Sequence, residues 1–134
     1  MHIDEMRCRF DDSPCAKYMG MKLIDLSEGY AKVEMKVREE FVNWENMIQG
    51  GIIVTLLDQA FGCACNTLDS IYIAIQMNIH FLAAASVGET IYADSKVLRA
   101  GKKIGTSVIT AFDSNGKTIA YATGATVCMG SRTK

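Results

Sequence analysis

The alternation of hydrophobic and polar positions predicts a strand hairpin near the start of the chain. From 30 to 38, apolar residues alternate strictly with charged ones, and a looser alternation runs from 21 to 26. A period of two indicates a strand with one face in the core and the other in solvent. Ser27, Glu28 and Gly29 lie between the two stretches, so we expect the turn there.

The pattern changes between about 50 and 66, where it predicts a helix that is buried on almost every side. Bulky apolar residues leave only a narrow stripe of this helix free. A short helix is predicted from about 13 to 19, because Ser13 followed by Pro14 is typical of a helix start and Gly20 of a helix end. The residues before Ser13 form a polar opening to which we assign no element.

The rest of the chain predicts four strands, at 71–82, 90–98, 103–113 and 118–129. Turn residues separate them, among them Gly88, Gly101 and the pair Asn115-Gly116, which favours a tight hairpin. We expect these four strands to follow one another as a meander. A long apolar helix with an antiparallel sheet curled around it is an α+β domain, and residues 1–134 fit one such domain.

The apolar content predicts a partner subunit. The chain has 134 residues, of which 49% are hydrophobic, and this fraction is at the high end for a soluble protein. One sheet cannot cover every side of so apolar a helix. We therefore expect a second copy of the chain to cover the rest, most often as a two-fold dimer, with a monomer as the alternative.

Charge and cysteine usage argue against several other classes of partner. The formal net charge is -1 and the basic residues are dispersed, so nucleic acid is not an expected partner. The longest apolar runs are too short to span a membrane, and the charged N-terminus lacks a secretory pattern, so we expect a cytoplasmic protein without membrane contact. None of the five cysteines has C-x-x-C spacing, and we assign no metal and no organic cofactor.

The free stripe of the long helix carries the candidate chemistry. Its members share one helical face by their spacing of three or four. They are Gly51, Thr55, Asp58 and Gly62, with Gln59 and Asn66 at the margin. The pattern alone leaves open whether the carboxylate of Asp58 only faces water.

The glycines at the start of the helix favour a functional role for Asp58. Gly50 and Gly51 have no side chains, so a ligand can approach the first-turn N–H groups, which lack intrahelical acceptors. These groups form an oxyanion-binding arrangement. Asp58 lies about 10 to 12 Å further along the axis, so either the substrate spans this separation or, in a homodimer, the acid acts on a substrate bound to the other subunit's amides.

These residues resemble a motif of the hot-dog-fold acyl-CoA thioesterases, in particular their PaaI-like group. That motif is Asn, five residues, His-Gly-Gly, six residues, Asp, and Asn43, Gln49-Gly50-Gly51 and Asp58 keep its spacing with Gln in place of His. Further similarities lie at 77–82, 88–89, 101–102 and 115–117. The resemblance implies the hot-dog fold, a homodimer or homotetramer with active sites at the dimer interface, and hydrolysis of acyl-CoA substrates without metal or cofactor.

The resemblance also implies roles for individual residues. Asp58 would be the general base or nucleophile, and the Gly50 N–H would bind the thioester carbonyl. Asn43 would orient the entry to the helix, and Gln49 would occupy the place of the histidine. The amide of Gln49 can still donate a hydrogen bond to a carbonyl, but it cannot titrate near neutrality as imidazole does.

The remaining candidates concern the substrate and the attacking water. Some group members carry Ser or Thr in the strand after the helix, where this chain has Ala74, so Thr55, Gln59 or Asn78 would have to position the water. The residues predicted to line the substrate site are Gly51, Thr55, Gln59, Ala74 and Phe81.

Two other functions remain as alternatives. A non-catalytic acyl-CoA or fatty-acid binding module is favoured by Gln49 and Ala74, but Asp58 counts against it, because a carboxylate contributes little to binding an anionic ligand. A dehydratase or hydratase would need a histidine next to an acid to shuttle protons, and the motif contains no histidine.

Overall fold

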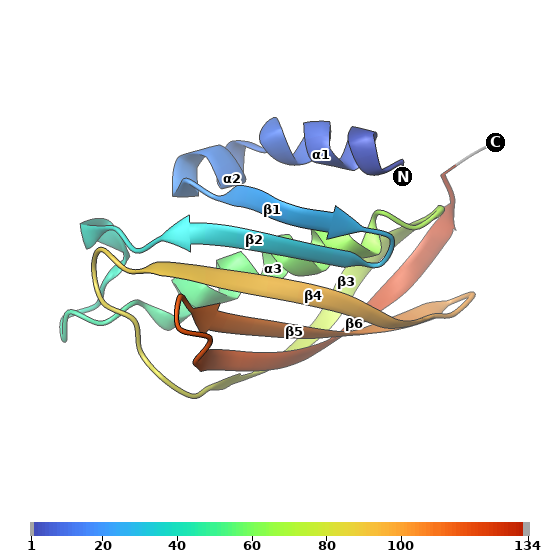
Figure 1. Ribbon diagram of the computed structural model, residues 1–134. Helices are drawn as coiled ribbons and strands as arrows, with labels where there is room; N and C mark the ends of the chain where they lie inside the picture. The colour runs from blue at the N-terminus through green and yellow to red at the C-terminus, as the bar shows by residue number, and fades with distance from the viewer. Residues whose placement is uncertain (1, 133–134) are drawn as a thin grey trace.

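The computed structural model describes residues 2–132, in which a curved antiparallel sheet wraps one long helix (Figure 1). The strands are β1 (Lys22–Ser27), β2 (Tyr30–Lys36), β3 (Ser70–Phe81), β4 (Thr90–Ala100), β5 (Ile104–Asp113) and β6 (Thr118–Ser131). The helices are α1 (Ile3–Asp11), α2 (Pro14–Met19), the 3-10 turn η1 (Glu39–Phe41) and the central α3 (Gly50–Cys65). No helix in this described part is long and apolar enough to cross a membrane.

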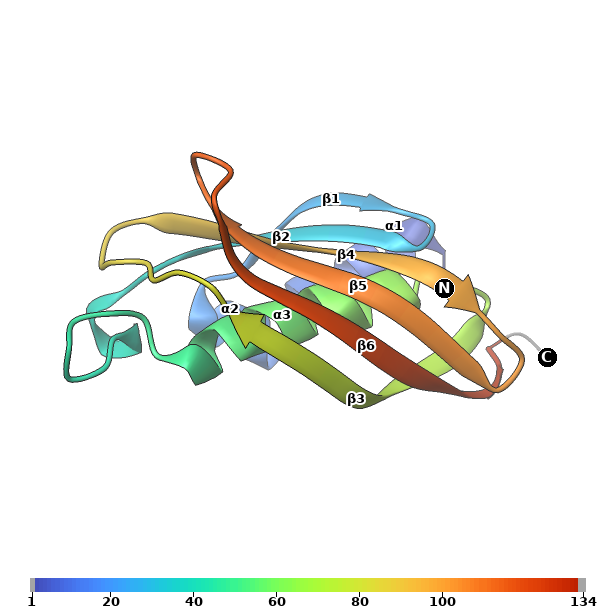
Figure 2. The ribbon, with the colours of Figure 1, turned by 90° about the horizontal axis from the view of Figure 1, so that it is seen from below.

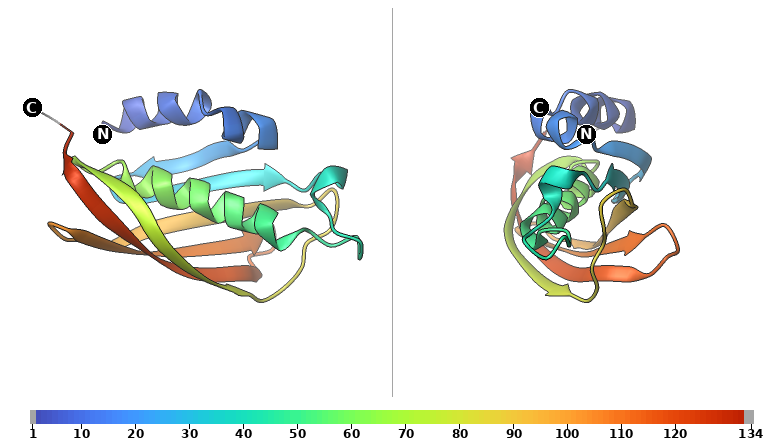
Figure 3. Two further views of the ribbon diagram at one scale, coloured as in Figure 1. Left: turned by 180° about the vertical axis from the view of Figure 1, so that it is seen from behind. Right: turned by 90° about the vertical axis from the view of Figure 1, so that its left-hand side faces the viewer.

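The predicted central helix is confirmed as α3, which lies in the concave side of the sheet (Figure 3). Its buried face includes Leu56, Leu57, Ala60 and Phe61, each fully shielded from solvent. The sheet comes so close that a Cβ on Gly124 of β6 would stand 2.5 Å from the Phe61 ring. Only glycine therefore allows β6 to pass over this part of the helix.

The N-terminal segment is partly as predicted. Ser13 caps α2 by accepting a hydrogen bond from the Ala16 N–H at 3.3 Å, and Gly20 ends the helix with a φ of 71°. The additional helix α1 was not predicted, because its apolar residues are few. It is held in place mainly by Phe10, which is buried in the core, and it runs alongside α3 and β1 (Figure 3).

The prediction of a four-strand meander is wrong for β3. The sheet order is β1-β2-β4-β5-β6-β3, so β4, β5 and β6 form a three-strand meander while β3 pairs with β6 at the far edge (Figure 2). β4 pairs with β2 instead. Because β3 lies at the opposite edge from β1, the sheet flanks α3 on both sides. The connection from β3 to β4 passes the start of the helix, where the Ala85 carbonyl accepts a hydrogen bond from the Ile48 N–H at 3.0 Å.

Candidate active site

The loop that leads into α3 is held in one shape by Asn43. Its Oδ1 accepts hydrogen bonds from the N–H groups of Glu45, at 2.8 Å, and Met47, at 3.3 Å. Its own N–H donates to the Met47 carbonyl at 2.7 Å. Asn46 completes the turn in a left-handed conformation, with a φ of 60°. The side chain predicted to orient the entry is thus engaged in shaping this loop.

The start of α3 presents N–H groups that are free to bind a ligand. Gln49 is the N-cap residue, but its side chain makes no capping hydrogen bond and is exposed. Within residues 2–132, no acceptor takes the N–H groups of Gly50 and Gly51. The Phe81 ring flanks this site and lies 3.4 Å from where a Cβ on Gly50 would stand. Gly50 and the Phe81 ring therefore lie side by side at the start of the helix.

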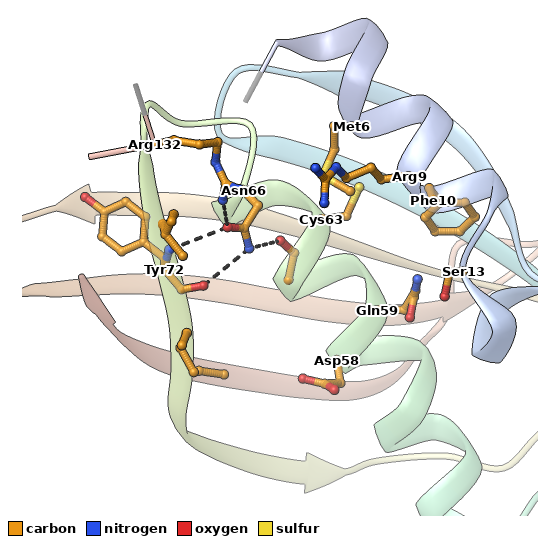
Figure 4. A pocket seen from close by; sticks show the side chains of 14 residues that line it. Met6, Arg9, Phe10, Ser13, Asp58, Gln59, Cys63, Asn66, Tyr72 and Arg132 are labelled. Atoms are coloured by element: carbon orange, nitrogen blue, oxygen red, sulfur yellow. Dashed lines mark hydrogen bonds between the residues drawn. The ribbon is translucent and has the colours of Figure 1, made fainter. Parts of the chain in front are cut away.

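Asp58 lies on the open side of α3, away from the buried face (Figure 4). Its side chain reaches solvent in the single chain, but the atoms packed around it desolvate the carboxylate and raise its pKa above the usual range of an aspartic acid. A carboxylate with a raised pKa is a better proton acceptor than an ordinary one. Perturbed carboxylates of this kind are typical of functional sites.

A cavity of about 550 Å³ opens beside Asp58, between α1, α3 and the first half of β3. Its lining from α3 and the C-cap residue that follows it consists of Asp58, Gln59, Gly62, Cys63 and Asn66. Residues 71–74 at the beginning of β3 form the opposite wall. The other lining residues are Met6, Arg9 and Phe10 of α1, together with Ser13 and Arg132 (Figure 4). Asp58, Gln59, Gly62 and Asn66 of the predicted stripe thus form the floor of a space large enough for an organic ligand, whereas Gly51 and Thr55 do not line it.

The other predicted residues are divided between this cavity and its surroundings. Gln59 and Ala74 line the cavity. The Thr55 hydroxyl donates to the Gly51 carbonyl at 2.9 Å, so its proton is not available to a water molecule. Asn78 is exposed between two residues that pack against the core, Met77 and Ile79, and therefore points to the outer face of the sheet, away from Asp58.

Comparison with known proteins identifies the family. The model of the family described as "Thioesterase superfamily" matches residues 45–120, a segment that contains the glycine pair, Asp58 and Ala74. The chain belongs to the thioesterase superfamily. The prediction that it is a thioester hydrolase is thereby confirmed, since relatives with this activity share the matched segment.

Individual relatives support the same placement. A putative esterase of Archaeoglobus fulgidus is 39% identical over 103 residues, which cover 77% of this chain and 67% of the relative. The acyl-coenzyme A thioesterase PaaI of Escherichia coli is 32% identical, over 86% of this chain and 82% of its own. The solved structure of E. coli PaaI superimposes with a TM-score of 0.89 and 31% identity, covering 92% of this chain and 90% of that one. The predicted hot-dog fold and PaaI-like grouping are confirmed.

Several residues of the thioesterase cavity were not predicted as site residues, among them two arginines and Asn66. Arg9 comes from α1, and Arg132 follows β6. Asn66, noted only as the margin of the stripe, accepts a hydrogen bond from Arg132 Nη2 at 2.6 Å. Both arginines lie outside the segment that the family model matches, and the packing that brings α1 and the chain end together over α3 has no local sequence pattern.

Proposed function

We propose that this thioesterase hydrolyses acyl-coenzyme A to the free acid and coenzyme A. The observation that carries the proposal is the arrangement on α3, where Asp58 faces an open cavity and the helix start offers free N–H groups. The E. coli relative is named as an acyl-coenzyme A thioesterase, which agrees with this substrate class.

The geometry suggests how the reaction proceeds. The thioester carbonyl accepts a hydrogen bond from the Gly50 N–H, which contributes on the order of 10² to 10³ in rate when it is aimed at the oxyanion. Asp58 takes a proton from the attacking water, which contributes about 10² to 10⁴, or attacks the carbonyl carbon itself. In the first route the carbon–sulfur bond breaks, the acyl carbon keeps the oxygen of the water, and coenzyme A leaves as the thiol with the proton that Asp58 took. In the second route the carbon–sulfur bond breaks to leave an anhydride between the acyl group and Asp58. Water then cleaves this anhydride to the free acid and the Asp58 carboxylate, and the proton that is released goes to the thiolate of coenzyme A.

Two subunits are needed to complete this site. Asp58 follows Gly50 by eight residues in one helix, which is a separation of about 12 Å along the axis. One carbonyl cannot contact both groups of a single chain at hydrogen-bond distance. We therefore place Asp58 of one subunit opposite the Gly50 N–H of the partner subunit, with Gln49 and Asn43 on the partner's side of the thioester.

The free edge of β3 is the surface that we assign to the dimer. β3 is the last strand of the sheet, and no strand of residues 2–132 covers its outer edge. Ile73, Ile75 and Phe81 on this strand are each at least half exposed. A long edge strand with apolar side chains is a template for pairing with another chain. Pairing of β3 with β3 of a second copy would give a homodimer, and two such dimers a homotetramer.

The proposal is tested by steady-state hydrolysis of aryl, short-chain and long-chain acyl-CoAs by the wild-type protein. We expect turnover of at least one class. Loss of thioester absorbance is the suitable readout, because the free cysteines would react with a thiol-detecting dye. If no acyl-CoA is hydrolysed but one of them raises the melting temperature, the protein is a binding module and the proposal is wrong.

Gln49→His is expected to raise kcat about tenfold, because an imidazole beside the carbonyl adds proton transfer to hydrogen bonding. The change should leave the melting temperature unaltered, since the Gln49 side chain is exposed and caps nothing. Gln49→Ala is the matched control and should lower kcat. Turnover by the histidine variant at or below the wild-type level would show that proton transfer at this position does not limit the reaction.

A further inference from the structure

The cavity beside Asp58 continues along α3 to a positively charged end. Among its lining residues, the charged ones are Asp58, Arg9 and Arg132. Figure 4 shows Arg132 next to Asn66, near the end of α3, with Asp58 further back along the same helix and Arg9 above Cys63. The acid and the two guanidinium groups therefore lie in different parts of one space, and each part faces a different portion of any ligand that fills it.

The floor between the two ends is open. Asp58, Gly62 and Asn66 follow one another at intervals of four residues, so they lie on one helical face. Along the helix axis, Gly62 is about 6 Å and Asn66 about 12 Å from Asp58. A Cβ placed on Gly62 would meet nothing within 4 Å. An acyl chain that starts at Asp58 can thus pass over Gly62 and reach Asn66 without a side chain in its way.

Asn66 fixes the position of Arg132 but leaves its charge without a counter-ion. The Asn66 amide nitrogen donates to the carbonyls of Gly62, at 2.9 Å, and Tyr72, at 3.3 Å, while its oxygen accepts from Arg132 Nη2. The Arg132 backbone N–H donates to the Asp69 carbonyl at 3.1 Å. Within the described residues, no carboxylate lies within 4.0 Å of Arg132.

One donor of this guanidinium has no acceptor. Arg132 Nε is shielded from solvent and makes no hydrogen bond within residues 2–132. A buried donor without a partner costs free energy, and for a charged group the cost is larger. Arg9 lies at the same end of the cavity, with its Nη2 3.3 Å from the exposed Glu5 carboxylate. The Arg132 guanidinium, which has no carboxylate partner among the described residues, therefore points to a ligand that brings an anionic acceptor.

We propose that the acyl group of the substrate carries a carboxylate at its far end, and that Arg132 and Arg9 bind it. This inference rests on the proposed function and names its substrate class: thioesters of dicarboxylic acids. Of the 12 Å between Asp58 and Asn66, hydrogen-bond contacts take about 3 Å at each end. About 6 Å remain, or roughly five bonds at ~1.2 Å each. Five bonds between the two carboxyl carbons correspond to an acid of about six carbons.

The phosphates of coenzyme A are the other anions that the substrate contains. The pantetheine arm between the thioester and the diphosphate spans about 13 bonds, or ~16 Å when extended, which exceeds the separation of Asp58 and Asn66. A terminal carboxylate fits this separation better. The two sources differ experimentally, because every acyl-CoA carries the phosphates and only some carry the carboxylate.

The test compares adipyl-CoA with hexanoyl-CoA, which have equal chain lengths and differ in the terminal carboxylate. We expect the wild type to have the higher kcat/KM for adipyl-CoA. Arg132→Met should lower the adipyl-to-hexanoyl ratio of kcat/KM by about tenfold or more, the value of a charge-assisted hydrogen bond. Arg132→Lys should restore part of the ratio. Lys96→Met, which removes a charge from the exposed outer face of β4, should leave the ratio unchanged.

An equal loss of kcat/KM on both substrates in Arg132→Met would assign Arg132 to the coenzyme A phosphates and overturn the inference, as would a wild-type preference for hexanoyl-CoA. Melting curves of each variant show whether the fold survives loss of the Asn66 contact, and Arg9→Met provides a second variant that leaves that contact intact. If neither substrate is hydrolysed but another acyl-CoA is, the inference falls and the proposed function stands. If no acyl-CoA is hydrolysed, the proposed function fails, and the inference is then decided by binding. It stands if adipyl-CoA raises the melting temperature more than hexanoyl-CoA, and it falls if the two are equal.

Discussion

Asp58→Asn is expected to lower kcat for acyl-CoA hydrolysis by about 10² to 10⁴, the contribution of a positioned general base. The amide has the same shape as the carboxylate but cannot accept a proton from water or attack the thioester as an anion. Asp58 makes no hydrogen bond or ion pair within residues 2–132 that the substitution would break. The loss should therefore appear in kcat while the fold remains intact.

The melting temperature separates a catalytic loss from an unfolded protein. Burial disfavours the charged form of Asp58 and raises its pKa, so at neutral pH the neutral amide should be at least as stable as the carboxylate. Glu28→Gln, in the exposed turn between β1 and β2, is the matched control and should keep full activity. An Asp58→Asn protein that folds and turns over at the wild-type rate would rule out the catalytic role of Asp58.

Gly50→Pro is expected to lower kcat by about 10² to 10³, because it removes the N–H that we assign to the oxyanion. Gly50 is the first residue of α3, where proline is well tolerated because the missing N–H has no intrahelical acceptor. The preceding residue, Gln49, already has the extended conformation that proline requires, with φ of -62° and ψ of 131°. The helix should therefore form normally without its first donor.

Gly50→Ala is the control for this experiment. Its Cβ makes the same approach to the Phe81 ring, at 3.4 Å, but the N–H remains. The alanine variant should retain most of the wild-type kcat, and the difference between the two variants isolates the donor. Equal losses in both would assign the effect to crowding against Phe81 and remove the N–H from the mechanism.

Much of the fold could be predicted from the sequence because its signals are local. The apolar pattern of α3 and the cap residues Ser13, Pro14 and Gly20 of α2 place both helices almost residue by residue. The place of β3 could not be predicted, since pairing with β6 is a contact between strands far apart in the chain. α1 was missed because its stability depends on burial of Phe10 against the rest of the protein, and not on its own periodicity.

The candidate site likewise has features that follow from local sequence spacing and features that depend on the folded chain. Helical spacing was enough to align Asp58 with Gly62, and the glycine pair marked the free N–H groups. The water-positioning candidates could not be tested by spacing, because the hydrogen bond of Thr55 and the outward direction of Asn78 depend on the folded chain. Arg132 could not be predicted as a site residue for the same reason, because it contacts Asn66 only when β6 ends beside α3.

The central claim is that each active site combines Asp58 of one subunit with the Gly50 N–H of the partner subunit. It is tested most directly by co-expressing Asp58→Asn and Gly50→Pro chains with different affinity tags and purifying the mixed dimer. One of its two sites then contains both wild-type groups, and the account predicts about half of the wild-type turnover per dimer. A purified mixed dimer that is no more active than either parent variant would contradict a shared site.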